Sequence, residues 1–185
     1  MGGGRYESQR LRKIGLKSNL EISKEKLNAM KLKKWLAKWN LDSLKINAEF
    51  LEVELSFKNA DKKAAWEMYI ELLTRISTQY LEPDHGDEKT ALTSIYTLFG
   101  ITRNILRQHG PESIEFAKIA IVILNQVIRP FTANWHKRSL EGAFNDPAQC
   151  LLFRKELEGL QVQLRNYTKL LSDIAGVEDL TELEK

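Results

Sequence analysis

Residues 146–176 carry the pattern that most restricts the fold, because their apolar side chains recur alternately four and three positions apart. That interval keeps the side chains on one side of an α-helix, where they form a seam that packs against other helices. Asp146 and Pro147 fit the N-cap and the first position of this helix, Gln149 fits the capping box, and Gly176 predicts its end. The seam consists of Phe153, Leu157, Leu160, Leu164, Tyr167, Leu171 and Ile174.

The same spacing recurs earlier in the chain and predicts an all-α fold, a bundle of five or six helices. Residues 114–128 are apolar nearly all round, so we expect this helix at the centre of the bundle. Pro130 is expected to stop or kink it. Besides the last helix, helices are expected at about 23–39, 59–80, 88–109, 111–128 and 131–140.

Residues 41–57 fit two different structures. The alternation of Leu44, Ile46 and Ala48 is typical of an extended chain, whereas Leu44, Ala48, Leu51 and Leu55 also share one face of a helix. We favour the helix, because an isolated pair of strands would leave its edges unpaired. A short extended segment near residues 44–57 remains the alternative.

Charge divides the chain unevenly. Residues 1–38 contain 11 Lys and Arg against three Asp and Glu, a net charge of +8, and the remainder has a net charge of −5. Residues 1–22 also contain four glycines and little periodicity, so we expect a flexible basic N-terminal arm. Residues 23–185 are expected to form a single helical-bundle domain.

The chain has one cysteine, Cys150, which excludes an intrachain disulfide and a cysteine-based zinc cage. The N-terminal residues lack the apolar core of a secretory signal, and the longest apolar run, Ile119–Leu124, is too short to span a membrane. These features predict a cytoplasmic protein without a transmembrane segment.

Arg103 and His109 form the first candidate site, because they match the loose pattern of the HEPN-type ribonucleases. In such a site a histidine transfers a proton while an arginine stabilises the developing phosphate charge. On one continuous helix, however, a six-residue spacing turns the two side chains about 120° apart. We therefore favour a structural reading, in which His109 belongs to the apolar stripe at a helix C-terminus and Arg103 lies on the surface.

Two further clusters are candidates for binding. Arg129, Trp135 and His136 surround the expected kink at Pro130 and could face a ligand or partner, although packing explains an aromatic residue at this spacing better. The basic N-terminal region could contact phosphates or an anionic surface, and a merely solvated helix face explains it equally well. Its candidate residues are Lys31, Lys33, Lys34, Lys38, Trp35 and Trp39.

Neither a metal site nor a cofactor is expected. His85, His109 and His136 lie in separate segments, and no carboxylate or histidine follows them at the spacing that ligands on a helix require. Cys150 falls in the first turn of the last helix, where a thiol is activated if exposed, but a free cysteine is more often a small buried apolar residue. No glycine-rich phosphate loop is present in the sequence.

Four segments together resemble a family of small, uncharacterised bacterial helical proteins, over roughly residues 40–180. They are AAWEMYIELLTRI (64–76), ALTSIYTLFG (91–100), TRNILRQHGP (102–111) and LNQVIRPFTANWH (124–136). Some members of that family lie in gene neighbourhoods linked to phage defence or other conflict between genomes. The resemblance therefore implies a bacterial protein that works with partner gene products, and it implies no catalytic residue.

Together these patterns predict a non-catalytic interaction or regulatory component of a bacterial cytosolic multi-protein system, with antiviral defence as the candidate system. Its partner would be another protein, of the same or a different sequence, bound through the seam helix or the basic N-terminal region. Two alternatives remain: a HEPN-like ribonuclease using Arg103 and His109, and a nucleic-acid-binding module using residues 1–38.

Overall fold

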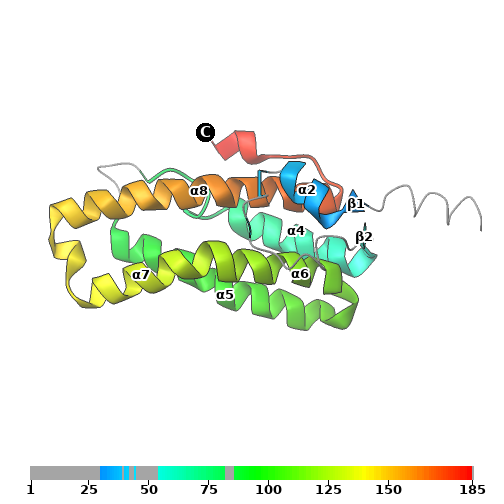
Figure 1. The fold of residues 1–185 in the computed structure, drawn as a ribbon, viewed down its shortest axis with the longest axis horizontal. Helices are drawn as coiled ribbons and strands as arrows, with labels where there is room; N and C mark the ends of the chain where they lie inside the picture. Colours follow the sequence, from blue (N-terminus) through cyan, green and yellow to red (C-terminus); the bar gives the residue numbers. More distant parts are fainter. Residues whose placement is uncertain (1–29, 39, 42–43, 45–53, 82–85, 185) are drawn as a thin grey trace, which may run out of the picture.

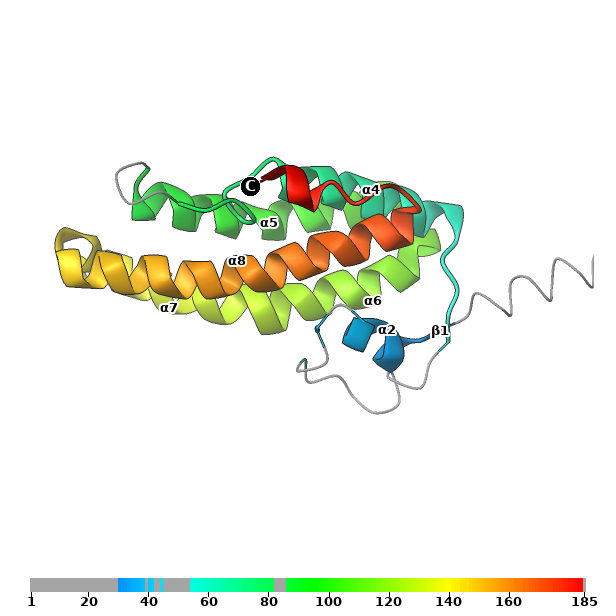
Figure 2. The same ribbon diagram turned by 90° about the horizontal axis from the view of Figure 1, so that it is seen from above.

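The computed structural model describes residues 30–38, 40–41, 44, 54–81 and 86–184. Four long helical rods lie side by side and form an elongated bundle (Figures 1 and 2). The all-α class is confirmed, but the expected number of five or six helices in the bundle is wrong. The rods are α4 (Asn59–Leu73), α5 (Glu88–His109), the continuous pair α6 (Ile114–Ile123) and α7 (Arg129–Leu140), and α8 (Pro147–Ala175).

Neighbouring rods along the chain run in opposite directions, and short turns connect two of the three pairs. Residues Gly110–Ser113 join α5 to α6, and Gly110 has a φ of +62°, which a glycine adopts without steric cost. A turn through residues 141–146 joins α7 to α8. One layer holds α4 beside α8, and the other holds α5 beside α6 and α7 (Figure 1).

Of the stop or kink predicted at Pro130, the stop is absent, and this is one reason for the smaller number of helices. Residues Leu124–Ile128 form a π-helical turn, in which the Arg129 amide donates to the Leu124 carbonyl five residues back. A proline lacks the amide hydrogen and crowds the carbonyl four residues before it. The wider turn directly before Pro130 accommodates the ring, so the helix continues from Ile114 to Leu140.

The predicted limits of α8 are confirmed. The Asp146 side chain accepts a hydrogen bond from the Ala148 amide at 2.9 Å, and Pro147 occupies the first helical position. Gly176 ends the helix in the left-handed conformation, with a φ of +71°. All seven seam residues from Phe153 to Ile174 are buried against the other helices.

The predicted end of α4 near Tyr80 is wrong, since the helix ends at Leu73. Beyond it the chain turns, and two side chains of α8 hold its carbonyl groups. Gln161 Nε2 donates to the carbonyls of Ile76 and Gln79, and Arg165 donates to that of Thr78 at 2.8 Å. These long-range hydrogen bonds replace those that a longer helix would have made internally.

Part of the N-terminal region also packs on the bundle. Leu36 from the short helix α2 (Leu32–Lys38) and Leu41 are buried in the common core. Strands β1 (Met30–Lys31) and β2 (Glu54–Leu55) form a two-residue antiparallel pair, so the favoured helix for 41–57 does not reach Glu54. The predicted arm at residues 1–22, the predicted helix start at Ser23 and most of 41–53 lie outside the described residues.

Within Glu88–Leu140, one 18-residue window is apolar enough to cross a membrane, and 44% of it is buried inside the bundle. The core helix of a bundle has the same composition, so this window is only weak evidence for a membrane segment. The absence of a transmembrane segment and the cytoplasmic location therefore stay predictions.

Candidate binding face on helices α5 and α7

Positive charge is concentrated in one layer of the bundle. Residues 89–140 contain seven Lys and Arg but only two acidic residues, Glu112 and Glu115. The flanking stretches, 39–88 and 141–185, together contain ten Lys and Arg against twenty Asp and Glu. Since α5, α6 and α7 form one layer (Figure 1), the excess of positive charge lies in that layer, whereas α4 and α8 together contain six Lys and Arg against six Asp and Glu.

The cationic residues of α5 follow one side of the helix. Lys89, Tyr96 and Arg103 are seven residues apart, and Arg107 lies one turn beyond Arg103. A seven-residue step returns to nearly the same direction, with a drift of about 20°. All four side chains are exposed, and Lys89 and Tyr96 line a pocket together with residues of α7. The four residues therefore follow one side of α5 over about 27 Å, and Lys89 and Tyr96 are the two that line the groove with α7.

Helix α7 contributes Arg129 and His136, again seven residues apart. The Arg129 guanidinium lies 5.0 Å from the ring centroid of Phe99 on α5, and its Nε donates to Asn125 Oδ1 at 3.0 Å. The His136 imidazole is stacked on the Tyr96 ring, with 6.5 Å between centroids and 16° between planes. We call the surface formed by Lys89, Tyr96, Arg103, Arg107, Arg129 and His136 the α5–α7 face.

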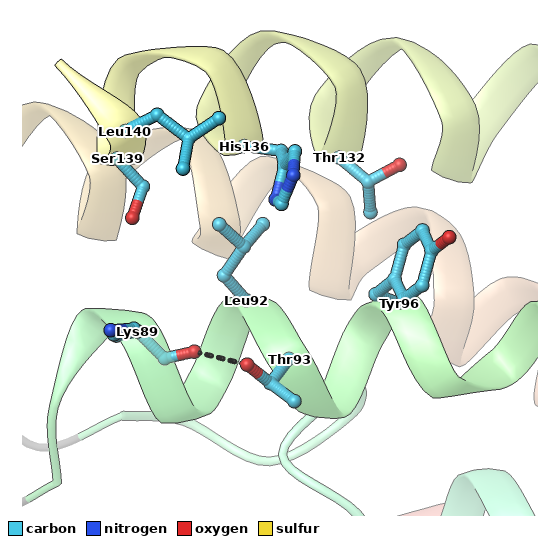
Figure 3. A pocket seen from close by; sticks show the side chains of 8 residues that line it. All are labelled: Lys89, Leu92, Thr93, Tyr96, Thr132, His136, Ser139 and Leu140. Atoms are coloured by element: carbon cyan, nitrogen blue, oxygen red, sulfur yellow. Dashed lines mark hydrogen bonds between the residues drawn. The ribbon is translucent and has the colours of Figure 1, made fainter.

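One end of this face contains a pocket of about 220 Å³ (Figure 3). Its walls come from two helices, and the Tyr96 and His136 side chains lie within it in the close-up. Leu140 is 78% exposed and Tyr96 is 62% exposed, so the pocket offers both an apolar edge and a flat aromatic surface. The lining residues are Lys89, Leu92, Thr93, Tyr96, Thr132, His136, Ser139 and Leu140.

The guanidinium groups on this face lack a negative partner in the described part of the chain. Arg103 and Arg107 make no ion pair or side-chain hydrogen bond there, and Arg129 contacts only the neutral Asn125 and Phe99. Elsewhere the structure pairs such groups, as it does Arg154 with Glu88 at 2.7 Å. The α5–α7 face therefore keeps its positive potential available to a ligand.

Arg103 and His109 are not brought together within one chain. His109 lies on the other side of α5, where its Nε2 is 2.8 Å from Glu67 Oε1 of α4 and its side chain is only 10% exposed. Gln108 donates to the same carboxylate oxygen at 3.2 Å. Because α5 is continuous through both residues, the expected separation of about 120° applies.

Trp135 belongs to the core, so it does not join Arg129 and His136 at the surface. Its ring is fully buried, lies 5.1 Å from the Phe153 ring at 89° and is stacked on Phe144 at 5.9 Å. Its Nε1 donates to Glu156 Oε2 at 2.7 Å, which satisfies the one polar group of the indole. The predicted cluster is therefore divided: Trp135 packs in the core, whereas Arg129 and His136 lie at the surface.

The N-terminal candidates are only partly described. Lys34 is exposed, and Lys38 Nζ lies 3.0 Å from Asp173 Oδ2 of α8. Trp39 lies outside the described residues, and so do the side chains of Lys31, Lys33 and Trp35.

The described residues contain no group of three His, Cys, Asp or Glu side chains that could hold a metal ion. The Cys150 thiol lies beside the Phe144 carbonyl at 3.4 Å. Its pKa is raised, first by burial and then by the nearby Glu88 carboxylate. A raised pKa lowers the thiolate fraction at neutral pH, so the position at a helix N-terminus does not activate this thiol.

Comparison with protein-family models, with curated proteins and with solved structures finds no match to this chain.

Sequence reasoning identified Arg103, Arg129 and His136 as candidates but missed Lys89, Tyr96 and Arg107. A signal was present, because residues 89–111 and 116–140 contain no acidic residue at all. Seven-residue spacing within α5 was a second signal. What the sequence could not show is that α5 and α7 are neighbours, which places the two basic stripes on one face.

Proposed function

We propose that this protein is a non-catalytic binding module, and that its α5–α7 face holds an anionic partner. The observation that carries the proposal is the pair Arg103 and Arg107, two exposed guanidinium groups without a carboxylate partner among the described residues. Guanidinium groups bind carboxylates and phosphates through paired hydrogen bonds. An unpaired row of them therefore favours an anionic ligand.

The excess of positive charge in one layer supports the same function. A surface of one sign attracts an oppositely charged partner over a distance and orients it before contact. The helices α4 and α8 carry equal numbers of basic and acidic residues, so the excess of positive charge on the other layer directs binding to that side of the bundle. The bacterial, cytosolic setting and the role in a multi-protein defence system are part of this proposal and derive from the sequence resemblance.

Heparin affinity chromatography of the full chain tests the proposal. The double variant Arg103→Gln/Arg107→Gln should elute at clearly lower salt than the wild type, because two phosphate-like contacts are lost. Lys62→Gln/Lys63→Gln is the matched control, since it removes two exposed charges of α4 beside Trp66, which is 41% exposed. Equal losses for both variants would contradict the proposal.

The non-catalytic part of the proposal is tested separately. Purified protein is incubated with RNA and with nucleoside triphosphates, and the products are separated by electrophoresis or chromatography. We expect no turnover. Turnover that Arg103→Gln or His109→Ala abolishes would overturn this part and favour the HEPN-like ribonuclease.

A further inference from the structure

Building on the proposed function, we infer that the α5–α7 face binds single-stranded nucleic acid, with its cations on the phosphates and Tyr96 stacked on a base. Proteins that bind single strands combine a positively charged groove with exposed aromatic rings. The α5–α7 face contains both features. Lys89, Arg103, Arg107 and Arg129 supply the charge, and Tyr96 supplies the ring.

The aromatic surface is suited to stacking. Tyr96 is 62% exposed, and its stacking on His136 at an interplanar angle of 16° holds the two rings nearly parallel. Figure 3 shows both rings in the pocket between α5 and α7. A base that enters this pocket can contact the faces and edges of the two rings. Lys89, which also lines the pocket, can then bind the adjacent phosphate.

The geometry favours a single strand over a duplex. An α-helix reads duplex DNA by entering the major groove, which is about 12 Å wide. The α5–α7 face consists of two packed helices, each about 10 Å across, and is too broad to enter that groove. Its cations instead follow the helix axis over about 27 Å, a length that suits an extended strand of several nucleotides.

The composition of the face favours nucleic acid over an acidic protein. The centre of a protein–protein interface is depleted of charged residues and enriched in apolar ones. Here the central positions of the face are Arg103 and Arg129, both exposed. The large exposed apolar side chain at the pocket, Leu140, lies at its edge and not at the centre of the cationic row.

The test is fluorescence anisotropy with dye-labelled dT20 and rU20, titrated with the full-chain protein at several salt concentrations. With four phosphate contacts, the logarithm of the affinity should fall against the logarithm of salt with a slope of about −3. Arg103→Gln/Arg107→Gln should lower affinity by roughly tenfold and reduce this slope by about 1 to 2. Lys62→Gln/Lys63→Gln should change it less than about twofold.

Stacking is tested independently by Tyr96→Leu, with Tyr80→Leu as the matched control because Tyr80 is 57% exposed and does not line the pocket. Loss of one stacked base should lower affinity at least about fivefold for Tyr96→Leu and leave the control unchanged. Circular dichroism spectra confirm that each variant is folded.

Several results would overturn the inference. These are the absence of oligonucleotide binding at 50 mM salt, equal losses for the face and control variants, and tighter binding of a 20-base-pair duplex than of either single strand. Binding only to vesicles with 30% phosphatidylserine, or only to polyglutamate, would assign the face to a membrane or an acidic protein. Face-dependent heparin retention without oligonucleotide binding would refute the inference while leaving the proposed function intact.

Discussion

The Asp61 carboxylate of α4 accepts a hydrogen bond from the backbone amide of Phe116 in α6, at 2.9 Å and across 55 residues of sequence. Its other oxygen accepts the Lys58 amide, also at 2.9 Å, at the start of α4. Asp61 is fully buried, so these amides satisfy a carboxylate that would otherwise be costly to bury. One side chain thus caps a helix and joins the two layers.

We therefore expect Asp61→Ala to lower the free energy of unfolding by about 2–4 kcal/mol, because it leaves two amides without an acceptor. Urea denaturation followed by circular dichroism measures the change. Glu158→Ala on the exposed side of α8 is the control and should stay within about 0.5 kcal/mol of the wild type. A loss below about 1 kcal/mol for Asp61→Ala would show that the two hydrogen bonds contribute little.

Tyr167, unlike Asp61, is not satisfied by its surroundings, since its hydroxyl is buried and has no hydrogen-bond partner among the described residues. Tyr167→Phe removes that unsatisfied group while the ring stays in place. The free energy of unfolding should rise by about 1 kcal/mol at pH 7. Tyr80→Phe, at an exposed position, should have no measurable effect. A destabilised Tyr167→Phe protein would contradict the description of this hydroxyl.

The same residue makes stability depend on alkaline pH. Burial raises the pKa of Tyr167 well above its ordinary value of 10.0, so the folded protein keeps the phenol proton after the unfolded chain has lost it. The stability that this proton provides is complete below about pH 10 and is lost as the pH rises further, by up to about 1.4 kcal/mol per pH unit. The advantage of Tyr167→Phe over the wild type should therefore grow between pH 10 and 11. An advantage independent of pH would contradict the expectation.

Gln161 of α8 holds the turn after α4, so its loss should loosen that turn selectively. Gln161→Leu keeps the side-chain volume but leaves the Ile76 and Gln79 carbonyls without their donor. We expect a loss of about 1–3 kcal/mol in unfolding free energy. Hydrogen exchange should increase most in residues 74–81, and an increase spread evenly over all helices would contradict a local role.

Cys150 should react slowly with alkylating reagents in the folded protein, because its raised pKa leaves little thiolate at pH 7.5. The control is Ala148→Cys in a Cys150→Ser background, which places a thiol on the exposed side of the same helical turn. Iodoacetamide should modify the control thiol at least about tenfold faster in buffer. In denaturant the two rates should become equal, and a fast reaction of folded Cys150 would contradict its raised pKa.

Local signals predicted some helix limits and long-range contacts determined others. Asp146, Pro147 and Gly176 determine α8 through interactions within a few residues, so its limits could be predicted. The end of α4 could not, because Ile76 continues the apolar periodicity past Leu73 and the turn depends on Gln161, 85 residues away. The residues near the end of α4 do not indicate that a distant side chain will bind their carbonyls.

The residues of the α5–α7 face divide in the same way, into those that local sequence could identify and those that depend on a distant neighbour. Arg129 and His136 could be selected because they surround a proline in an aromatic segment, and Arg103 because of a spacing pattern that resembles ribonucleases. Tyr96 shares the seven-residue spacing of Lys89 and Arg103, but that spacing does not show that its ring stacks on His136 of α7. Knowledge of which helices are adjacent was the missing information.

The π-helical turn Leu124–Ile128 has a geometric consequence for everything that follows it in the chain. Compared with an uninterrupted α-helix, it holds one additional residue, and each residue advances a helix by about 100°. Shortening the turn by one residue would rotate Arg129 and His136 off their line with α5 and would move Trp135 out of the hydrophobic interior. A single-residue change in the length of this helix would thus redirect a whole surface without altering any side chain on it.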